Sequence, residues 1–484
     1  MLTKRSIRER AVLVASLITI AALALYVYTS SARELYNSEI ARRGWGYVSD
    51  EVWYVSSSRV ILKKLLGLEP RQPPSLYNAT VILAEKPNVW ELGEIANKYR
   101  VEILRADFRE LNAVYVSGAR ESVEKFIKSL GGRVVDVIPG WVLPDYKDVN
   151  NYINWEHPPL GKYLIALVMY TLGDSPLYWR IPVVIAGVLT AIFTFLVVYV
   201  LVKNTIAPLV AALLTLVDPI SRALFSIALL DGYVALFTVI ALYFVVKGNY
   251  KAGLLVTLIG ACFKASALFT AIPLIVLLSR REALSSGGSV AVFIKSSVWY
   301  SAITALLYLL ILAGASAPIV SYMGIVEWLN NAVFGAAKWH ASVKCVDPAR
   351  CPVSSSPWDW FIGVNSFLLY VYPDGTRLYA TGFYPLWSLS LISALLFTPL
   401  VYTRKREYGY IVLVFLGTLT GYIGLWVIGG RTQYSFYAVH FAPLVYVNLV
   451  YVFSEIVPRR ELVREAVEYW VKLFSSVISR LVAL

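Results

Sequence analysis

The chain is poor in the residues that build metal clusters and disulfide frameworks, since its 484 residues include only three cysteines and three histidines. Cys262 lies in an apolar segment, whereas Cys345 and Cys351 lie close together in a long loop. The spacing of this second pair permits a small disulfide loop in an oxidising compartment. No further cysteine or histidine pair lies nearby, so a disulfide is favoured there over a metal site.

Charged residues are also scarce, at 15% of the chain, while apolar residues make up 58% and the mean hydropathy is +0.63. Several apolar segments approach the length that a helix needs to cross a bilayer. The first, Ala11 to Tyr28, follows basic residues, but no convincing small-residue cleavage site comes after it. We therefore expect an integral membrane protein, in contact with membrane lipids, whose first apolar segment is retained as an anchor.

The formal net charge of +13 does not indicate a nucleic-acid partner, because the basic residues stand in short clusters beside apolar segments. Under the positive-inside rule, such clusters lie in the cytoplasm. This predicts a multi-pass protein of the cell membrane with both termini in the cytoplasm. The clusters are Lys4 to Arg10, Lys203, Lys247 with Lys251, Arg280 with Arg281 and Lys295, Arg404 to Arg406, and Arg459 with Arg460.

The same orientation decides which apolar segments cross. The run Leu160 to Leu172 is short, and if it crossed, Lys203 would lie outside, so we expect an interfacial helix there. The stretch between Lys251 and Arg280 is too short for two spans and predicts a hairpin of short helices with Lys264 near its outer apex. The expected later crossings are Ile181 to Val202, Ile206 to Val217, Gly232 to Val246, Ser297 to Pro318, Leu386 to Tyr402, Tyr410 to Ile428, and Ala438 to Phe453.

Between Asn78 and Gly140 the composition becomes that of a soluble domain. Alternating apolar residues, an asparagine before one helix and a glycine pair after the other predict the order βαββαβ, a small ferredoxin-like unit. This insert has no nucleophile, metal cluster or Gly-rich loop, which favours an interaction or lid role over an enzymatic one. The expected strands are Val81–Leu83, Val101–Leu104, Ala113–Val116 and Val134–Val137, and the expected helices are Val89–Tyr99 and Glu121–Leu130.

Polar strings on the predicted outer side follow a recognisable order. Ser49-Asp50-Glu51 comes after the first apolar segment, and His157-Pro158-Pro159-Leu160-Gly161-Lys162 comes after the insert. With these and four further strings the chain resembles the dolichyl-phosphate-mannose protein O-mannosyltransferase family of GT-C membrane glycosyltransferases. The further strings are Arg180-Ile181-Pro182, Ala228-Leu229-Leu230-Asp231, Ser355-Ser356-Pro357-Trp358-Asp359-Trp360, and Arg431 to Pro443.

The chain departs from the family pattern in four places. The insert separates Asp50 from His157, Ser226 stands where an Arg normally precedes Leu-Leu-Asp, and a Gly-Phe-Tyr-Pro string beginning at Gly382 replaces Gly-Asn-Pro. The large luminal domain of eukaryotic members is also absent. The departures leave the identity of the acceptor open.

The resemblance and the hydropathy pattern together predict a mainly α, polytopic membrane protein, a GT-C type bundle of about 10 transmembrane or short membrane helices with an inserted small α+β domain outside the cytoplasm. The final stretch, Glu461 to Leu484, is amphipathic and is expected along the cytoplasmic surface. The expected domains are 1–77 with the first crossing and acidic string, 78–145 the insert, 146–318 the catalytic membrane module, 319–385 a large outer loop, 386–456 the last crossings, and 457–484 the amphipathic helix.

The resemblance implies an inverting glycosyltransferase that moves a sugar, mannose in this family, from a dolichyl- or polyprenyl-phosphate to a Ser/Thr hydroxyl of an exported protein. The donor phosphate is a good leaving group, so the reaction needs a base for the acceptor hydroxyl and cations for the phosphate, but no general acid. Asp50 is the candidate base, and Glu51 orients it or binds the acceptor. The alternative is that both acids only cap a helix.

Donor-phosphate and substrate contacts are expected from a wider set of residues. Arg180 offers a planar fork of donors and Lys264 a point charge. The alternatives are snorkelling from a helix end for Arg180 and an ion pair with Asp231 for Lys264. The full set of candidates is His157, Lys162, Arg180, Arg222, Asp231, Lys264, His340, Trp358 and Arg431.

We expect no cofactor; the alternative is Mg²⁺ or Mn²⁺ held by Asp50, Glu51 and Asp231. A lipid or polysaccharide acceptor, as in aminoarabinose-type transferases, is an open alternative to an exported protein. A transporter would place charges at mid-membrane depth on helices related by an internal repeat, whereas here they gather on one face. A nonenzymatic scaffold, the third alternative, predicts that Asp50→Asn leaves biological activity intact.

Overall fold

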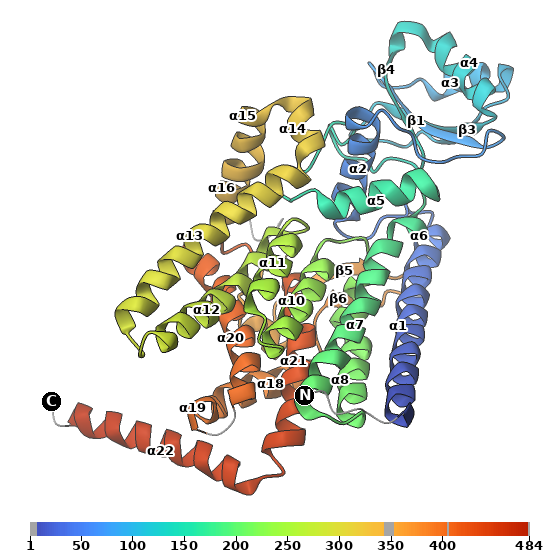
Figure 1. The fold of residues 1–484 in the computed structure, drawn as a ribbon. Coiled ribbons are helices and arrows are strands. Elements are labelled where there is room, and N and C mark those ends of the chain that lie inside the picture. Colours follow the sequence, from blue (N-terminus) through green and yellow to red (C-terminus); the bar gives the residue numbers. More distant parts are fainter. Residues whose placement is uncertain (1–6, 343–352, 404–405, 483–484) are drawn as a thin grey trace.

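Apolar helices stand side by side through most of the described residues, which are 7–342, 353–403 and 406–482 of this computed structural model (Figure 1). Among the described residues, five helical stretches are long and apolar enough to cross a membrane, and five shorter apolar helices accompany them. The expectation of a mainly α membrane protein is confirmed, while the number of crossings stays a prediction. The bundle helices are α1 (Ile7–Ala41), α5 (Leu160–Thr171), α7 (Ile181–Val202), α8 (Ile206–Val217), α10 (Asp231–Val246), α11 (Tyr250–Ala261), α12 (Ala271–Ser285), α13 (Val290–Ala315), α18 (Tyr384–Leu396), α20 (Arg406–Val427) and α21 (Ala442–Tyr451).

The bounds of these helices follow from local chemistry. α7 and α8 begin and end at the predicted residues, because Pro182 fits the first turn of α7 and Lys203 ends it in a left-handed conformation (φ 58°). α1 continues well beyond the predicted Tyr28, since the polar residues that follow are good helix formers. One continuous crossing from Leu386 to Tyr402 is wrong: α18 stops before Pro399, whose ring is incompatible with a helix interior.

The predicted hairpin between α10 and α13 is confirmed as a chain path. α11 ends at Ala261, Lys264 takes an extended conformation, and a 3₁₀ turn (Ala265–Thr270) leads into α12. α10 packs against α7 and α11, and α12 packs against α13 and α20. Lys264 therefore lies at a helix end inside the bundle.

The insert has the predicted order βαββαβ, with strands β1 (Tyr77–Leu83), β2 (Glu102–Arg105), β3 (Ala113–Gly118) and β4 (Val134–Pro139) and helices α3 (Val89–Lys98) and α4 (Arg120–Leu130). The sheet is antiparallel with the strand order β2-β3-β1-β4, and Val81 stands opposite both Val114 and Val137. Asn88 caps α3 by accepting from the backbone of Trp90 and Glu91. These features confirm the ferredoxin-like split unit.

The two faces of this sheet have different partners. Alternate residues of β1, such as Ala79 and Val81, pack beneath α3 and α4. On the other face, Ile82 and Tyr115 pack with Trp45, which precedes β1, and with Trp141, which follows β4. The insert is thereby seated on the end of the bundle (Figure 1).

A buried polar network around Asp174 joins the insert to the bundle. Asp174, between α5 and α6 (Pro176–Trp179), accepts two hydrogen bonds from Arg59 of α2 (Glu51–Val60), at 2.5 and 2.9 Å. It also accepts from the backbone N–H of Trp141 (2.9 Å) and from the indole of Trp179 (2.6 Å). The insert, α2 and the bundle are therefore held in one arrangement.

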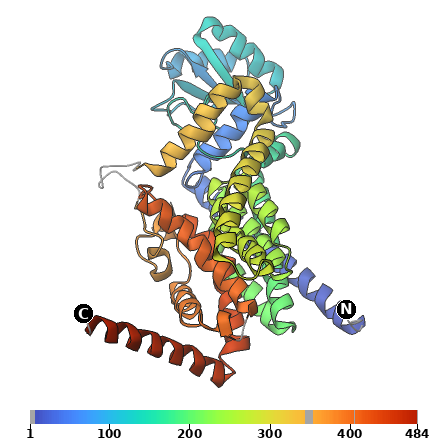
Figure 2. The ribbon, with the colours of Figure 1, turned by 60° about the vertical axis from the view of Figure 1, so that its left-hand side comes forward.

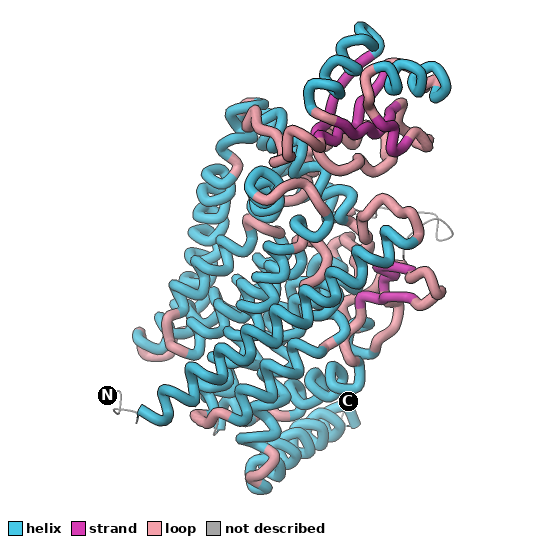
Figure 3. Tube along the Cα trace, turned by 90° about the vertical axis from the view of Figure 1, so that its right-hand side faces the viewer, coloured by secondary structure: helices cyan, strands magenta, loops and turns pink. Residues whose placement is uncertain are grey.

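The remaining elements lie around the bundle ends. Strands occur in two places, the insert and a separate hairpin on the flank (Figure 3). α22 runs across the bundle axis at the end opposite the insert in both ribbon views (Figures 1 and 2). The remaining elements are α9 (Pro219–Leu224), α14 (Ala317–Met323), α15 (Ile325–Trp328), α16 (Ala336–Ala341), α17 (Asp359–Ile362), β5 (Phe367–Val371), β6 (Arg377–Ala380), α19 (Leu400–Thr403) and α22 (Arg460–Val482), and the irregular turns Ile61–Leu65, Gly131–Arg133, Leu329–Gly335, Ser435–Phe441 and Val452–Ile456.

Candidate active site

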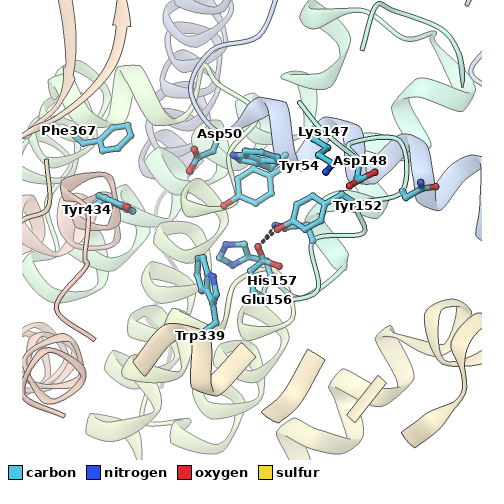
Figure 4. A pocket seen from close by; sticks show the side chains of 13 residues that line it. Asp50, Tyr54, Lys147, Asp148, Tyr152, Glu156, His157, Trp339, Phe367 and Tyr434 are labelled. Atoms are coloured by element: carbon cyan, nitrogen blue, oxygen red, sulfur yellow. Dashed lines mark hydrogen bonds between the residues drawn. The ribbon is translucent and has the colours of Figure 1, made fainter. Parts of the chain in front are cut away.

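A cavity of about 710 Å³ lies at the insert end of the bundle, where several segments far apart in the sequence meet (Figure 4). α2 forms one wall, the segment leaving the insert forms another, and α16, β5 and the loop before Ser435 complete it. Its lining residues are Asp50, Trp53, Tyr54, Lys147, Asp148, Asn151, Tyr152, Asn154, Glu156, His157, Trp339, Phe367 and Tyr434.

Asp50 reaches the cavity from the start of α2. Ser49 has a left-handed conformation (φ 53°) that turns the chain, so that Asp50 takes the N-cap position. Its side chain makes no capping hydrogen bond to the helix. In Figure 4 the Asp50 carboxylate lies between Tyr54 and Tyr434. A cap alone therefore does not account for this acid.

Glu51, the neighbouring acid, points away into the protein and is fully buried. Both oxygens accept from Arg180, Nε to Oε1 and Nη2 to Oε2 at 2.8 Å each. They also accept from the backbone N–H groups of Val48 (2.8 Å) and Ala228 (2.7 Å). This fully bonded carboxylate fixes the first turn of α2, and thereby the place of Asp50.

The structure gives Arg180 a different position from the expected phosphate contact. It is fully buried, and besides Glu51 its guanidinium donates to the carbonyls of Ala32 (3.0 Å) and Gly46 (3.4 Å). The snorkelling alternative fails for the same reason. A guanidinium used in this way does not reach the cavity, so Arg180 acts on it through Glu51.

The string from His157 to Lys162 places His157 in the cavity wall and Lys162 behind it. Lys162 is buried and donates to three backbone carbonyls, those of Ile153 (3.0 Å), Asn154 (2.7 Å) and His157 (2.8 Å). All three ammonium donors are used in holding the loop. Lys162 is therefore placed to position His157, and it does not line the cavity.

In the same string, the close packing around Gly161 leaves no room for a larger side chain. A Cβ added there would overlap the side chain of Leu230 at the start of α10, which is fully buried. We expect Gly161→Ala to destabilise the protein by about 1–3 kcal/mol, because the core must shift to admit a methyl group. Thermal unfolding in detergent measures this.

A glycine in an open position provides the control for that substitution. Gly93 lies in α3, and an added Cβ would meet nothing within 4 Å. Gly93→Ala is expected to be neutral or to stabilise by up to about 1 kcal/mol, since alanine favours a helix. Equal behaviour of the two variants would contradict the close approach of α5 and α10.

Aromatic rings surround His157. The rings of Tyr54, Trp339 and His340 have centroids 5.5, 5.9 and 5.4 Å from that of His157. His340 does not line the cavity, but its Nε2 donates to the carbonyl of Glu156 (3.1 Å). α16 thus places His340 beside His157, the other histidine among the predicted site residues.

Lys264 and Asp231 form an ion pair behind the cavity. The Lys264 ammonium lies 2.7 and 2.8 Å from the two oxygens of Asp231, and both side chains are buried. The ammonium also lies 4.3 Å from the centre of the Tyr437 ring. The alternative weighed for Lys264, pairing with Asp231, is the arrangement found, and neither residue lines the cavity.

This pairing bears on the Mg²⁺ or Mn²⁺ alternative. Glu51 is held by Arg180 and Asp231 by Lys264, so these acids do not converge with Asp50 as a ligand set. Within the described ranges no group of three or more histidine, cysteine, aspartate or glutamate residues forms a metal site.

The other candidates lie apart from the cavity. Arg222 lines a separate crevice of about 180 Å³ and donates to Ser31 (3.4 Å). Trp358 and Arg431 both contact Trp426. The Trp358 and Trp426 ring centroids are 5.0 Å apart, and the Arg431 Cζ lies 5.3 Å from the centroid of the Trp426 ring. Cys345 and Cys351 lie outside the described residues.

Six polar residues of one cavity wall were not among the site candidates predicted from the sequence. They lie on the segment between the insert and His157 and are Lys147, Asp148, Asn151, Tyr152, Asn154 and Glu156. The Tyr152 hydroxyl donates to Glu156, and burial and then the Glu156 carboxylate raise the pKa of Tyr152 above its ordinary value. Within the described chain, Lys147 is the one lysine or arginine that lines the cavity. Their nearness to the histidine string was the only available signal.

Known proteins resemble parts of the chain. No protein-family model matches it. A polyprenol-phosphate-mannose–protein mannosyltransferase of Corynebacterium glutamicum is 27% identical over 119 residues, which is 24% of this chain and 23% of the relative. One of Mycolicibacterium smegmatis is 32% identical over 85 residues, which is 18% of this chain and 16% of the relative. The chain thus spans about a quarter or less of the length of these relatives.

Among solved structures, ArnT from Cupriavidus metallidurans, crystallised with undecaprenyl phosphate, is 13% identical with a TM-score of 0.39. The match covers 63% of this chain and 51% of that one. The mannosyltransferase matches confirm, for part of the chain, the family resemblance that the strings indicated.

Proposed function

We propose that the protein is an inverting membrane glycosyltransferase that moves a sugar, mannose by its relatives, from a polyprenyl phosphate to a hydroxyl of an exported protein. One observation carries the proposal: Asp50 and His157, from two separate strings, line one cavity at the end of an apolar bundle. A lipid-borne donor needs this combination of an apolar flank and a polar, partly enclosed pocket.

Asp50 serves as the base in this proposal. The acceptor oxygen bonds to the anomeric carbon while the bond from that carbon to the phosphate oxygen breaks. The hydroxyl proton passes to the Asp50 carboxylate, and the polyprenyl phosphate leaves with the electron pair. One displacement of this kind inverts the anomeric carbon.

The neighbouring residues divide the remaining tasks. We assign His157 to the donor phosphate as a ring N–H donor, with the Trp339 and Tyr54 rings in T-shaped contact with it. Arg180, Glu51 and Lys162 are positioning residues, because each is fully used in holding the loops that carry Asp50 and His157. The buried Lys264–Asp231 pair lies behind the cavity, where it supports the Tyr437 ring.

The proposed orientation places the cavity outside the cytoplasm. The basic residues Lys203, Lys247, Arg280 and Arg281 lie at the ends of α7, α10 and α12 that are remote from the strings at Asp50 and His157. The positive-inside rule assigns those ends to the cytoplasm. Accessibility labelling of an introduced cysteine at Asp374, in the β5–β6 turn, tests this side.

Transfer to protein is the expected result with a labelled donor. The full chain in lipid nanodiscs, given polyprenyl-phosphate [³H]mannose and a Ser/Thr-rich polypeptide, should release label on protease digestion and leave little new label in the lipid extract. Label in a new lipid product would instead favour the lipid acceptor. Unchanged donor with every acceptor would contradict glycosyl transfer.

A further inference from the structure

We propose that the segment from Tyr146 to Glu156, defined here as the exit segment because it leaves the insert, binds the acceptor and selects a polypeptide with a basic side chain beside the accepting hydroxyl. This inference rests on the proposed function and names the acceptor class. It also gives the insert a task, since the insert holds this segment in place.

The exit segment forms the wall of the cavity that faces water. Lys147, Asp148 and Asn151 are exposed and line the cavity. Lys147 and Asp148 lie across Tyr54 from Asp50 in Figure 4. An isoprenoid chain gains nothing against charged, hydrated side chains. The acceptor, which arrives from water, can extend from Asp50 along this wall.

The charges of the cavity favour a cationic acceptor. Its described lining contains three carboxylates, those of Asp50, Asp148 and Glu156, against the single ammonium of Lys147. Glu156 accepts hydrogen bonds from Tyr152 and Asn154, and both of these bonds are made to its Oε1. Opposite charges attract a partner and like charges repel it, so a lysine or arginine beside the hydroxyl is preferred to an acid.

The insert anchors the exit segment through Asp136 of β4. Asp136 accepts from Asn150 of the segment (3.3 Å) and from Lys63, in the turn that follows α2. Burial raises the pKa of Asp136, but the hydrogen bond and charge of Lys63 and the hydrogen bond of Asn150 lower it by more, so the carboxylate is ionised at neutral pH.

Two further contacts join the exit segment to the helix that follows Asp50. Lys64 donates to Asn151, and the Trp53 ring packs against the rings of Tyr146 and Tyr152, with centroids 4.7 and 5.6 Å away. The wall and the candidate base are therefore fixed to the same helix. A shift of the insert would move the wall relative to the base.

Peptide kinetics on the full chain in nanodiscs test the inference. Three peptides share one threonine and differ only in its neighbours, which are lysine, alanine or glutamate. The lysine peptide is expected to have a KM about fivefold to tenfold below that of the glutamate peptide, with similar kcat. Equal KM values for the three peptides would overturn the inference, while the proposed function would survive.

Asp148→Asn assigns the preference to the exit segment. Its side chain is exposed, so the variant is expected to fold, to raise the KM of the lysine peptide about threefold to fivefold, and to change the KM of the alanine peptide by less. Glu121→Gln makes the same charge change on α4, outside the cavity, and should change neither value. A preference unaffected by Asp148→Asn would overturn the assignment.

Asp136→Asn tests the anchor. With one bond to Lys63 weakened, the KM of all three peptides should rise while donor hydrolysis by water keeps its rate. If donor hydrolysis falls together with peptide transfer, Asp136 supports the fold and the anchoring proposal is overturned. Absence of any donor turnover in the unmodified protein would instead refute the proposed function.

Discussion

Replacing Asp50 with asparagine is expected to lower kcat for sugar transfer by about 10²–10⁴-fold, because the acceptor hydroxyl loses the carboxylate that takes its proton. The amide keeps the shape of the side chain, so the thermal stability and the KM for the donor should stay close to those of the unmodified protein. Single-turnover transfer of labelled mannose at saturating donor measures the loss.

Asp374→Asn is the matched control for that experiment. Asp374 lies in the exposed β5–β6 turn, where Oδ1 accepts from the backbone of Thr376 (2.9 Å), and it is remote from the cavity lining. Its kcat should be that of the unmodified protein. Full transfer by a correctly folded Asp50→Asn protein would remove Asp50 as the base.

Arg180→Met is expected to destabilise the protein by about 3–5 kcal/mol, the loss typical when one partner of a buried ion pair is removed. The substitution leaves the Glu51 carboxylate buried, with only the backbone donors of Val48 and Ala228. Thermal unfolding in detergent, with the yield of folded protein, measures the effect. Addition of Glu51→Gln should recover part of the loss, because the uncompensated charge is then gone.

Arg222→Met serves as the control for a lost arginine. Arg222 is exposed and has one long bond to Ser31, so we expect a change within about 0.5 kcal/mol. The comparison of Arg180→Met with this control also decides between two roles for Arg180, the ion pair with Glu51 and contact with the donor phosphate. A stable Arg180→Met protein with a strongly raised KM for the donor would return Arg180 to the phosphate.

Features that depend on neighbours in the sequence were predictable. Pro182 and Lys203 set the ends of α7, and the apolar alternation of β1 together with the cap at Asn88 set the insert. The order of the strings also located Asp50 and His157 on one end of the bundle. Each of these rests on a local conformational preference or on the cost of burying charge.

Which polar groups pair was not predictable. Glu51 and Arg180 stand 129 positions apart, and either could have faced a ligand as well as each other. The sequence marked Lys162 as a candidate substrate contact, yet nothing in it says that three backbone carbonyls would surround the ammonium. Lys147 and Asp148 have the composition of any exposed loop, so only the tertiary fold identifies them with the cavity.

The insert's place between the two strings affects the order in which the parts of the cavity are made. A ribosome that adds about 5–20 residues per second needs roughly 5 to 20 seconds to go from Asp50 to His157. All of the insert is synthesised in that interval, which is long compared with the folding time of a small domain. The later wall residues Trp339, Phe367 and Tyr434 are made only afterwards, so the insert can fold before the cavity is complete.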